Sequence, residues 1–167
     1  MSRLMSFLNE INQEAATTRK FLSIVPDSEF GWRPHSKSMT IKQLATHIAE
    51  LPGWASMAFT TDELDFAATP YKPEDLNSSE ELVAFFDKEI ATAQQFLSDP
   101  ANESKLDEPW VLRAGTQILM NITKGELVRH SISQTIHHRA QLGVYLRLLD
   151  IAIPGSYGPS ADEMGGA

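Results

Sequence analysis

Cysteine is absent from the 167 residues of this chain. The chain therefore forms no disulfide, binds no metal through thiolate and uses no cysteine nucleophile. Any thiol chemistry would need a thiol that the substrate brings. Long apolar runs are also missing, since no segment approaches the roughly 18 residues of a membrane-spanning helix. The N-terminus lacks the apolar stretch of a signal peptide, so we expect a cytoplasmic protein.

Basic runs are missing as well. The 14 lysines and arginines are outnumbered by 22 aspartates and glutamates, which gives a net charge of −8. Such a surface is poorly suited to nucleic-acid phosphates or anionic lipid headgroups, so binding to nucleic acid or to a membrane is disfavoured. The apolar fraction of 42% is ordinary for a globular protein. The length favours a single domain over residues 1–167.

Four segments carry apolar side chains at helical spacing, at about residues 2–25, 40–59, 78–99 and 126–149. Thr40 and Gln43 form a capping-box pattern at the start of the second segment. Pro52 and Gly53 should bend or break that segment, and the residues from Trp54 onward can resume it. Four helices of this length predict an all-α fold, a four-helix bundle.

Two long links join these segments and allow crossover connections. Residues 60–77 are acidic and contain two prolines, which indicates a surface loop with at most a short helical turn. Residues 110–112 and 117–122 favour extended structure and are separated by Ala114 and Gly115, which predicts a small β-hairpin or an extended crossover before the last helix. The tail over residues 151–167 is turn-rich and irregular.

The last predicted helix carries a polar stripe. At about 100° per residue, His130, Gln134, His137, His138 and Gln141 share a sector roughly 100° wide, the width of a core-facing side. The rest of the helix is largely apolar. Buried polar side chains need partners, and a metal ion is one candidate.

His47 lies beside the apolar seam of the second predicted helix, where facing helices of a bundle build metal sites. Side chains four residues apart on a helix are neighbours, which makes His130, Gln134 and His138 a ladder. His47, His138 and one more ligand from that ladder would leave coordination positions open for water or substrate. Glu50, one turn after His47, is a candidate partner or base for it, although a solvated surface glutamate is the commoner case.

Three stretches carry a resemblance to a known family: WRPHSKSMTIKQLATHIAELPGW, HSISQTIHHRAQL and YLRLLDIAIPGSYGPSADE. They resemble the DinB-like (DinB/YfiT) superfamily, which has one histidine on its second helix and an H-x-x-x-H-R-x-Q pattern on its last long helix. His47 matches the first position, and His138, Arg139 and Gln141 match the end of the pattern. Gln134 stands where that pattern has its first histidine.

The resemblance implies a four-helix fold, frequent homodimerisation, and a divalent ion such as zinc or nickel held by three histidines. Here the corresponding set is His47, Gln134 and His138. An amide oxygen is a weaker ligand than imidazole for these ions, so the metal would be bound weakly or not at all. His130 or His137 would then either replace a ligand or contact the ligands without binding the metal. Alternatively, the site would be empty of metal and filled by buried water.

Some members of the superfamily are thiol-dependent S-transferases that use bacillithiol, mycothiol or glutathione, and many have no known activity. The resemblance thus favours a metal-dependent transferase or hydrolase in which a metal-activated thiol or water attacks a small electrophile. The alternative is a non-catalytic dimeric stress or binding protein with a degenerate or empty site. Arg139, opposite the stripe, is expected to pair with an acidic residue of another helix or of a dimer partner. Tyr157 either packs or covers the pocket as a lid.

Overall fold

The computed structural model describes residues 2–165. The predicted domain over 1–167 and the predicted tail over 151–167 thus include residues 1 and 166–167, which lie outside the described part. The described residues contain five α-helices: α1 (Arg3–Ser23), α2 (Ile41–Glu50), α3 (Pro52–Thr60), α4 (Ser79–Ser98) and α5 (Lys124–Leu148). They also contain three strands: β1 (Glu63–Asp65), β2 (Pro109–Ala114) and β3 (Gln117–Thr123).

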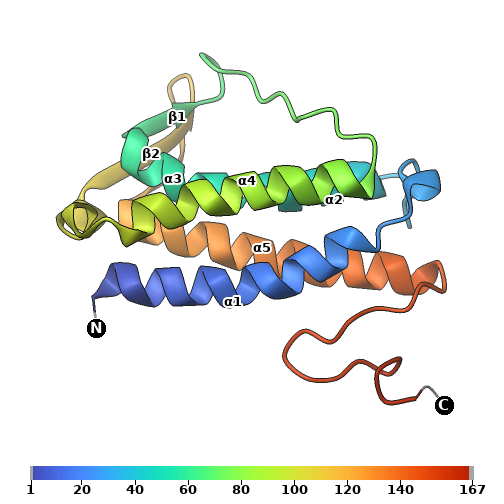
Figure 1. The fold of residues 1–167 in the computed structure, drawn as a ribbon. Helices are drawn as coiled ribbons and strands as arrows, with labels where there is room; N and C mark the ends of the chain where they lie inside the picture. The colour runs from blue at the N-terminus through green and yellow to red at the C-terminus, as the bar shows by residue number, and fades with distance from the viewer. Residues whose placement is uncertain (1, 166–167) are drawn as a thin grey trace.

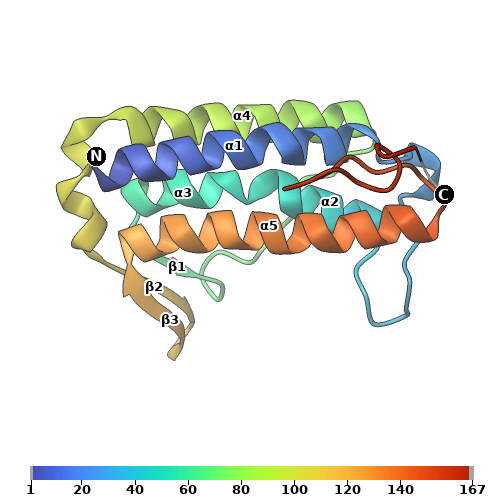
Figure 2. The same cartoon turned by 90° about the horizontal axis from the view of Figure 1, so that it is seen from below.

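The helices lie side by side with their long axes roughly aligned (Figures 1 and 2). α1 packs on α4 and α5, and the consecutive helices α2 and α3 pack on α4 and α5 as well. The mainly helical architecture expected from the sequence is confirmed. The core that the helices share includes the following buried side chains: Leu22, Ile41, Ile48, Leu82, Phe86, Leu127 and Leu146. None of the helices described for residues 2–165 has the length and apolarity needed to cross a membrane.

The second predicted helix is divided at Pro52. Thr40 caps α2 through the predicted capping box with Gln43, and α2 ends at Glu50. Pro52 has no N–H to continue the hydrogen-bond ladder, but its fixed φ suits the first turn of a new helix, and it begins α3. Residues 2–165 therefore contain five α-helices where the sequence predicts four. Ser131 of α5 donates a buried hydrogen bond of 2.7 Å to the Leu51 carbonyl, which ties this junction to α5.

The predicted hairpin is present, and a strand that the sequence analysis missed joins it. β2 and β3 are antiparallel, with Gly115 at φ +60° in the turn between them, and β1 pairs in parallel with β2. Arg113 donates to both carboxylate oxygens of Glu63, at 2.9 and 2.7 Å. Asp65 accepts from the Gly115 amide at 2.9 Å. The prediction of a plain loop over residues 60–77 is thus wrong at Glu63–Asp65.

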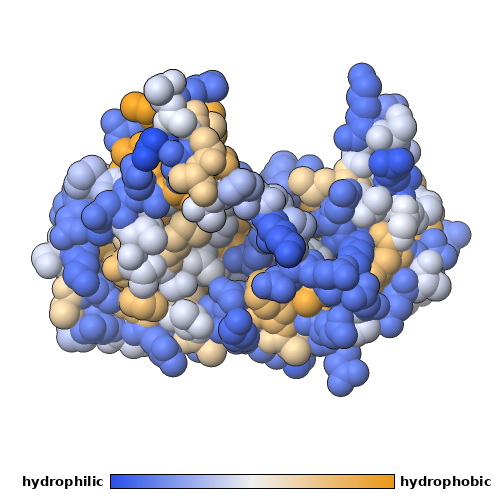
Figure 3. All heavy atoms as spheres, turned by 90° about the horizontal axis from the view of Figure 1, so that it is seen from above, coloured by the Kyte–Doolittle hydropathy of each residue, from blue (hydrophilic) through white to orange (hydrophobic). Residues whose placement is uncertain are grey.

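The sheet is anchored to the helices at one end and projects into solvent at the other. Trp110 of β2 is fully buried, and its indole N–H donates to the Thr61 hydroxyl at 3.0 Å. At the other end the hairpin stands out from the helical body and carries apolar side chains, as Figure 3 shows. Ile118 and Leu119 of the edge strand β3 are 61% and 48% exposed.

A buried ion pair joins α1, α5 and the C-terminal tail. Arg139 is 1% exposed, and its Nη1 lies 2.6 Å from Oε2 of Glu14 on α1. The same guanidinium donates to the Thr18 hydroxyl at 3.0 Å. Tyr157 of the tail donates to Oε1 of Glu14 at 3.0 Å. The expectation that Arg139 pairs with an acidic residue of another helix is confirmed.

Replacing Arg139 with alanine is expected to lower the free energy of unfolding by about 3–5 kcal/mol, because the Glu14 carboxylate then stays buried without its cation. Urea denaturation measures the loss. Arg129→Ala is the matched control, since that arginine forms an exposed ion pair with Glu10 on the same two helices and its loss costs under about 1 kcal/mol. The double variant Glu14→Leu with Arg139→Met should recover most of the stability. An Arg139→Ala loss no larger than that of the control would contradict the role given to the pair.

Candidate functional site

The last turn of α2 holds a histidine and a carboxylate in contact. Glu50 follows His47 by three residues, so both side chains lie on one face of the helix. Nδ1 of His47 is 2.6 Å from Oε1 of Glu50, and the Tyr71 hydroxyl donates to the same oxygen at 2.7 Å. The side chains of His47 and Glu50 are only 23% and 16% exposed. Glu50 is therefore the partner of His47 and not a solvated surface residue.

His138 of α5 faces His47. The two ring centroids are 4.8 Å apart and the ring planes meet at 75°. Nδ1 of His138 is 2.8 Å from Oε1 of Gln141, one turn further along α5. Each imidazole thus has a protein partner at Nδ1, and its Nε2 is left for another ligand. The predicted meeting of His47 and His138 from two separate helices is what the structure shows.

The other predicted ligands lie outside this pair of facing rings. His137 is exposed, with its ring centroid 4.9 Å from that of His138, and His130 packs against Trp54 instead, at 6.2 Å. Gln134 is half-buried, and no hydrogen bond joins it to either imidazole in residues 2–165. Over the same described range, no group of three or more histidine, aspartate or glutamate side chains is arranged to hold a metal ion.

The polar stripe of α5 lies at the margin of the core, which corrects the core-facing placement expected from its width. The core-facing side of α5 is instead lined by Leu127, Val128, Ile132, Leu142 and Leu146, all buried. The stripe is wide enough to be a buried face, but the apolar residues supply more burial free energy and take that place.

Partial burial changes the proton affinity of two of these histidines. Burial lowers the pKa of His130. Burial also lowers the pKa of His138, an effect that the neighbouring His47 and His137 strengthen and the Gln141 contact opposes. The lowered pKa favours the neutral form of His130 and of His138, and the neutral form of histidine is the one that binds metal ions.

A cavity of about 450 Å³ opens beside His47 and Glu50. Its walls come from α2, α3, β2 and the connection after β1. The lining side chains are Met39, Gln43, His47, Glu50, Trp54, Phe66, Tyr71, Pro73 and Leu112. Sequence reasoning missed Phe66, Tyr71 and Pro73, because they lie in a connection without hydrophobic periodicity, and its only signal was the aromatic residues among prolines.

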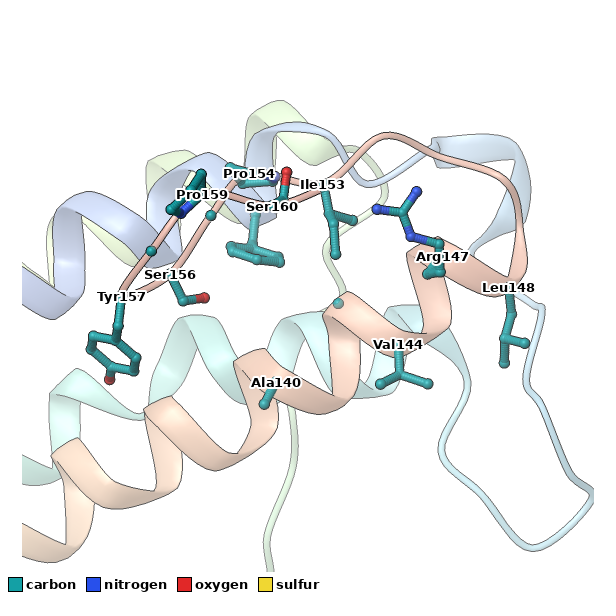
Figure 4. Close-up of a pocket in the computed structure, with 14 residues that line it drawn as sticks. Ala140, Val144, Arg147, Leu148, Ile153, Pro154, Ser156, Tyr157, Pro159 and Ser160 are labelled. Atoms are coloured by element: carbon teal, nitrogen blue, oxygen red, sulfur yellow. The ribbon is translucent and has the colours of Figure 1, made fainter. Parts of the chain in front are cut away.

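A second, larger cavity of about 570 Å³ lies between α5 and the tail (Figure 4). Its walls include Phe21, Val144, Leu148 and Ile153, and no histidine or carboxylate lines it. Tyr157 borders this second cavity and not the one beside His47, so the suggestion that Tyr157 is a lid over the histidine site is wrong. Of these two cavities, the one beside His47 is therefore the one whose described lining includes a histidine and a carboxylate.

The sequence profile of the DinB family matches residues 1–165. The chain belongs to the DinB family. The resemblance inferred from the sequence is thus confirmed over nearly the whole chain. The uncharacterized protein YrdA of Bacillus subtilis (strain 168) is 24% identical over 167 residues, which cover 94% of this chain and 89% of YrdA.

Solved structures of DinB-like proteins share the fold. The structure of YjoA from Bacillus subtilis has a TM-score of 0.68 at 17% identity and covers 90% of this chain and 96% of that one. A DinB-like protein from Bacillus cereus ATCC 10987 has a TM-score of 0.67 at 19% identity, with 90% and 95% coverage. A putative DinB-family member from Exiguobacterium sibiricum 255-15 has a TM-score of 0.65 at 19% identity, with 93% and 97% coverage. At these identities the likeness concerns the fold alone.

Glu89 of α4 leads to a prediction about how the stability of the protein depends on pH. Glu89 lies against Gly53, where a Cβ would stand 2.5 Å from its Oε2. Burial raises the pKa of Glu89 above its ordinary value of 4.5, the charges of Glu50 and Glu74 raise it further, and Lys88 opposes them. A raised folded pKa means that the folded state binds the proton more tightly, so stability falls as the pH rises from about 4.5 through the folded pKa.

Glu89→Gln removes this penalty, so the variant should melt at a higher temperature than the parent protein at pH 7. The difference should shrink as the pH is lowered through about 4.5, where Glu89 is protonated in both states. Thermal unfolding followed by circular dichroism at several pH values measures it. Asp87→Asn on the same helix is the control, because its partner Arg19 is on the surface. A parent protein more stable than the Glu89→Gln variant at pH 7 would contradict the expected direction of the effect.

Proposed function

We propose that this DinB-family protein is a divalent-metal-dependent enzyme that acts on small electrophilic substrates. His47 and His138 are the two imidazole ligands, and Gln134 is a weak third ligand. The observation that carries the proposal is the pair of imidazoles, whose ring centroids are 4.8 Å apart and whose Nδ1 atoms each contact a protein oxygen. Within residues 2–165, no hydrogen bond involves the Nε2 atom of either ring.

The chemistry of these side chains fits a metal ion such as zinc or nickel. A histidine that binds metal commonly has its other ring nitrogen on a carboxylate or an amide oxygen, which fixes the ring and its tautomer. Glu50 and Gln141 provide these contacts. Gln134 precedes His138 by one turn and is half-buried on the same side of α5. Its amide oxygen is a weaker ligand than imidazole, so we expect modest affinity.

A bound divalent cation supplies Lewis acidity, which lowers the pKa of a water or of a low-molecular-weight thiol so that the deprotonated form exists at neutral pH. The protein's own side chains do the rest. Glu50 orients His47, Tyr71 holds Glu50, and the apolar walls of the cavity keep water from the substrate. A thiol cosubstrate gives transfer to the electrophile, and water gives hydrolysis.

The architecture is consistent with this proposal. We propose that α2 and α3 act as one interrupted member of a four-helix bundle with α1, α4 and α5, and bundles build metal sites between facing helices. The exposed apolar side chains of β3 are compatible with a homodimer, and we propose that the protein works in the cytoplasm as such a dimer.

A second candidate is a non-catalytic stress or binding protein whose site has lost its metal. It is favoured by the lack of a three-residue group of histidine or acidic ligands in residues 2–165, together with glutamine at position 134. Metal content separates the two candidates.

Protein purified without a histidine tag or a chelator should contain near-stoichiometric zinc, nickel or iron by elemental analysis. His47→Ala and His138→Ala should lose it, and Gln134→His should raise the affinity by about tenfold or more, since imidazole replaces an amide oxygen. His35→Ala is the matched control, because His35 is exposed in the loop before α2. Protein that stays empty after incubation with these ions would exclude the enzyme and leave the binding protein.

The contact between Glu50 and His47 should be measurable in metal affinity. Glu50→Gln is expected to weaken binding by about 10- to 100-fold, because it removes the carboxylate that orients the ring and raises its basicity. Tyr71→Phe, which leaves the Glu50–His47 contact in place, should have a smaller effect. Competition with a chromophoric chelator gives the affinities. Equal losses in Glu50→Gln and in the remote variant Glu10→Gln would show that Glu50 does not support a ligand.

A further inference from the structure

We propose that the cavity beside His47 binds an organic cation, a small molecule whose ammonium group carries apolar substituents. If the protein is the enzyme proposed above, this cation is its substrate. The binding argument itself requires no metal, so the two proposals can fail separately.

Three aromatic rings from two separate parts of the chain line this cavity. Trp54 comes from the first turn of α3, and Phe66 and Tyr71 come from the connection between β1 and α4. The face of an aromatic ring carries negative potential, which attracts a cation that is only weakly hydrated. The remaining walls are mainly Met39, Pro73 and Leu112, which favour alkyl groups over a bare, strongly hydrated ammonium.

The charge of the lining is negative. Among the described residues that line the cavity, Glu50 is the one carboxylate, and none is a lysine or an arginine. Oε1 of Glu50 accepts from Tyr71 and contacts His47, whereas within residues 2–165 no hydrogen bond reaches its Oε2. An anionic ligand is therefore repelled.

A neutral apolar ligand is also a poorer match than a cation. It would displace water from Oε2 of Glu50, the oxygen that no described hydrogen-bond donor reaches, without replacing the lost solvation, and that loss is costly beside apolar walls. A cation with apolar substituents meets the carboxylate with its charge and the aromatic rings with its alkyl groups. Aromatic faces beside a carboxylate are the arrangement that recognises substituted ammonium ions.

The test uses three probes of nearly equal shape on metal-free, full-length protein: choline, its neutral isostere 3,3-dimethylbutan-1-ol, and the anion 3,3-dimethylbutanoate. NMR titration gives each affinity. Choline should bind at least about tenfold more tightly than the alcohol, and the anion should bind weakest. An alcohol that binds as well as choline overturns the proposal, as does the absence of binding by both choline and the larger benzyltrimethylammonium ion.

Single substitutions test which side chains of the cavity produce the preference for choline. Glu50→Gln should reduce the preference for choline over the alcohol by about threefold or more, because only the aromatic faces then favour the cation, while Glu10→Gln, with the same net charge but on a helix that does not line the cavity, should keep it. Trp54→Leu should lower choline affinity by about fivefold or more, and Trp54→Phe should retain most of it because an aromatic face remains. Thermal melting verifies that each variant is folded. A preference unchanged in folded Glu50→Gln protein would overturn the assignment.

Discussion

The junction between α2 and α3 is the constraint on which the site depends. Pro52 ends one helix and starts the next, so His47 and Glu50 occupy the final turn of α2 while Trp54 occupies the first turn of α3. An uninterrupted helix would carry all three along one straight axis. The buried hydrogen bond from Ser131 to the Leu51 carbonyl fixes this junction against α5, the helix that provides His138. The helix that carries His47 and the helix that carries His138 are thus joined by a buried hydrogen bond beside this proline.

Glu50 connects the two chemical features of the cavity. One of its oxygens contacts His47 and accepts from Tyr71, and the other has no hydrogen bond from a described side chain. The same carboxylate therefore orients a candidate metal ligand and gives the cavity its negative charge.

Local signals in the sequence are enough to predict much of the fold. The capping box at Thr40, the break at Pro52 and the hairpin around Gly115 each depend on residues within a few positions, and all three are present. β1 escapes such prediction because it is three residues long and is held by distant side chains, chiefly Arg113 of β2. The number of helices depends on how completely Pro52 divides its segment, which composition alone does not decide.

The candidate site is predictable only where helices carry it. His47 and His138 can be paired because helical periodicity and the family pattern place each on a known face. The polar stripe on α5 is as wide as a core-facing side. Helical periodicity gives the angles between side chains around the helix axis, but it does not tell which side of the helix is buried. Tyr71 cannot be placed from sequence, since its contact with Glu50 spans a connection whose path is set by tertiary packing.

The cavity has walls of two kinds, and this division bears on how such a protein diversifies. His47 and Trp54 stand on helices packed into the core, whereas Phe66, Tyr71 and Pro73 stand on a connection between β1 and α4. Insertions and replacements in a surface connection leave the helical framework in place. The shape and polarity of the ligand that fits can therefore drift through that connection while the reactive groups keep their positions, so that new specificities arise on an unchanged scaffold.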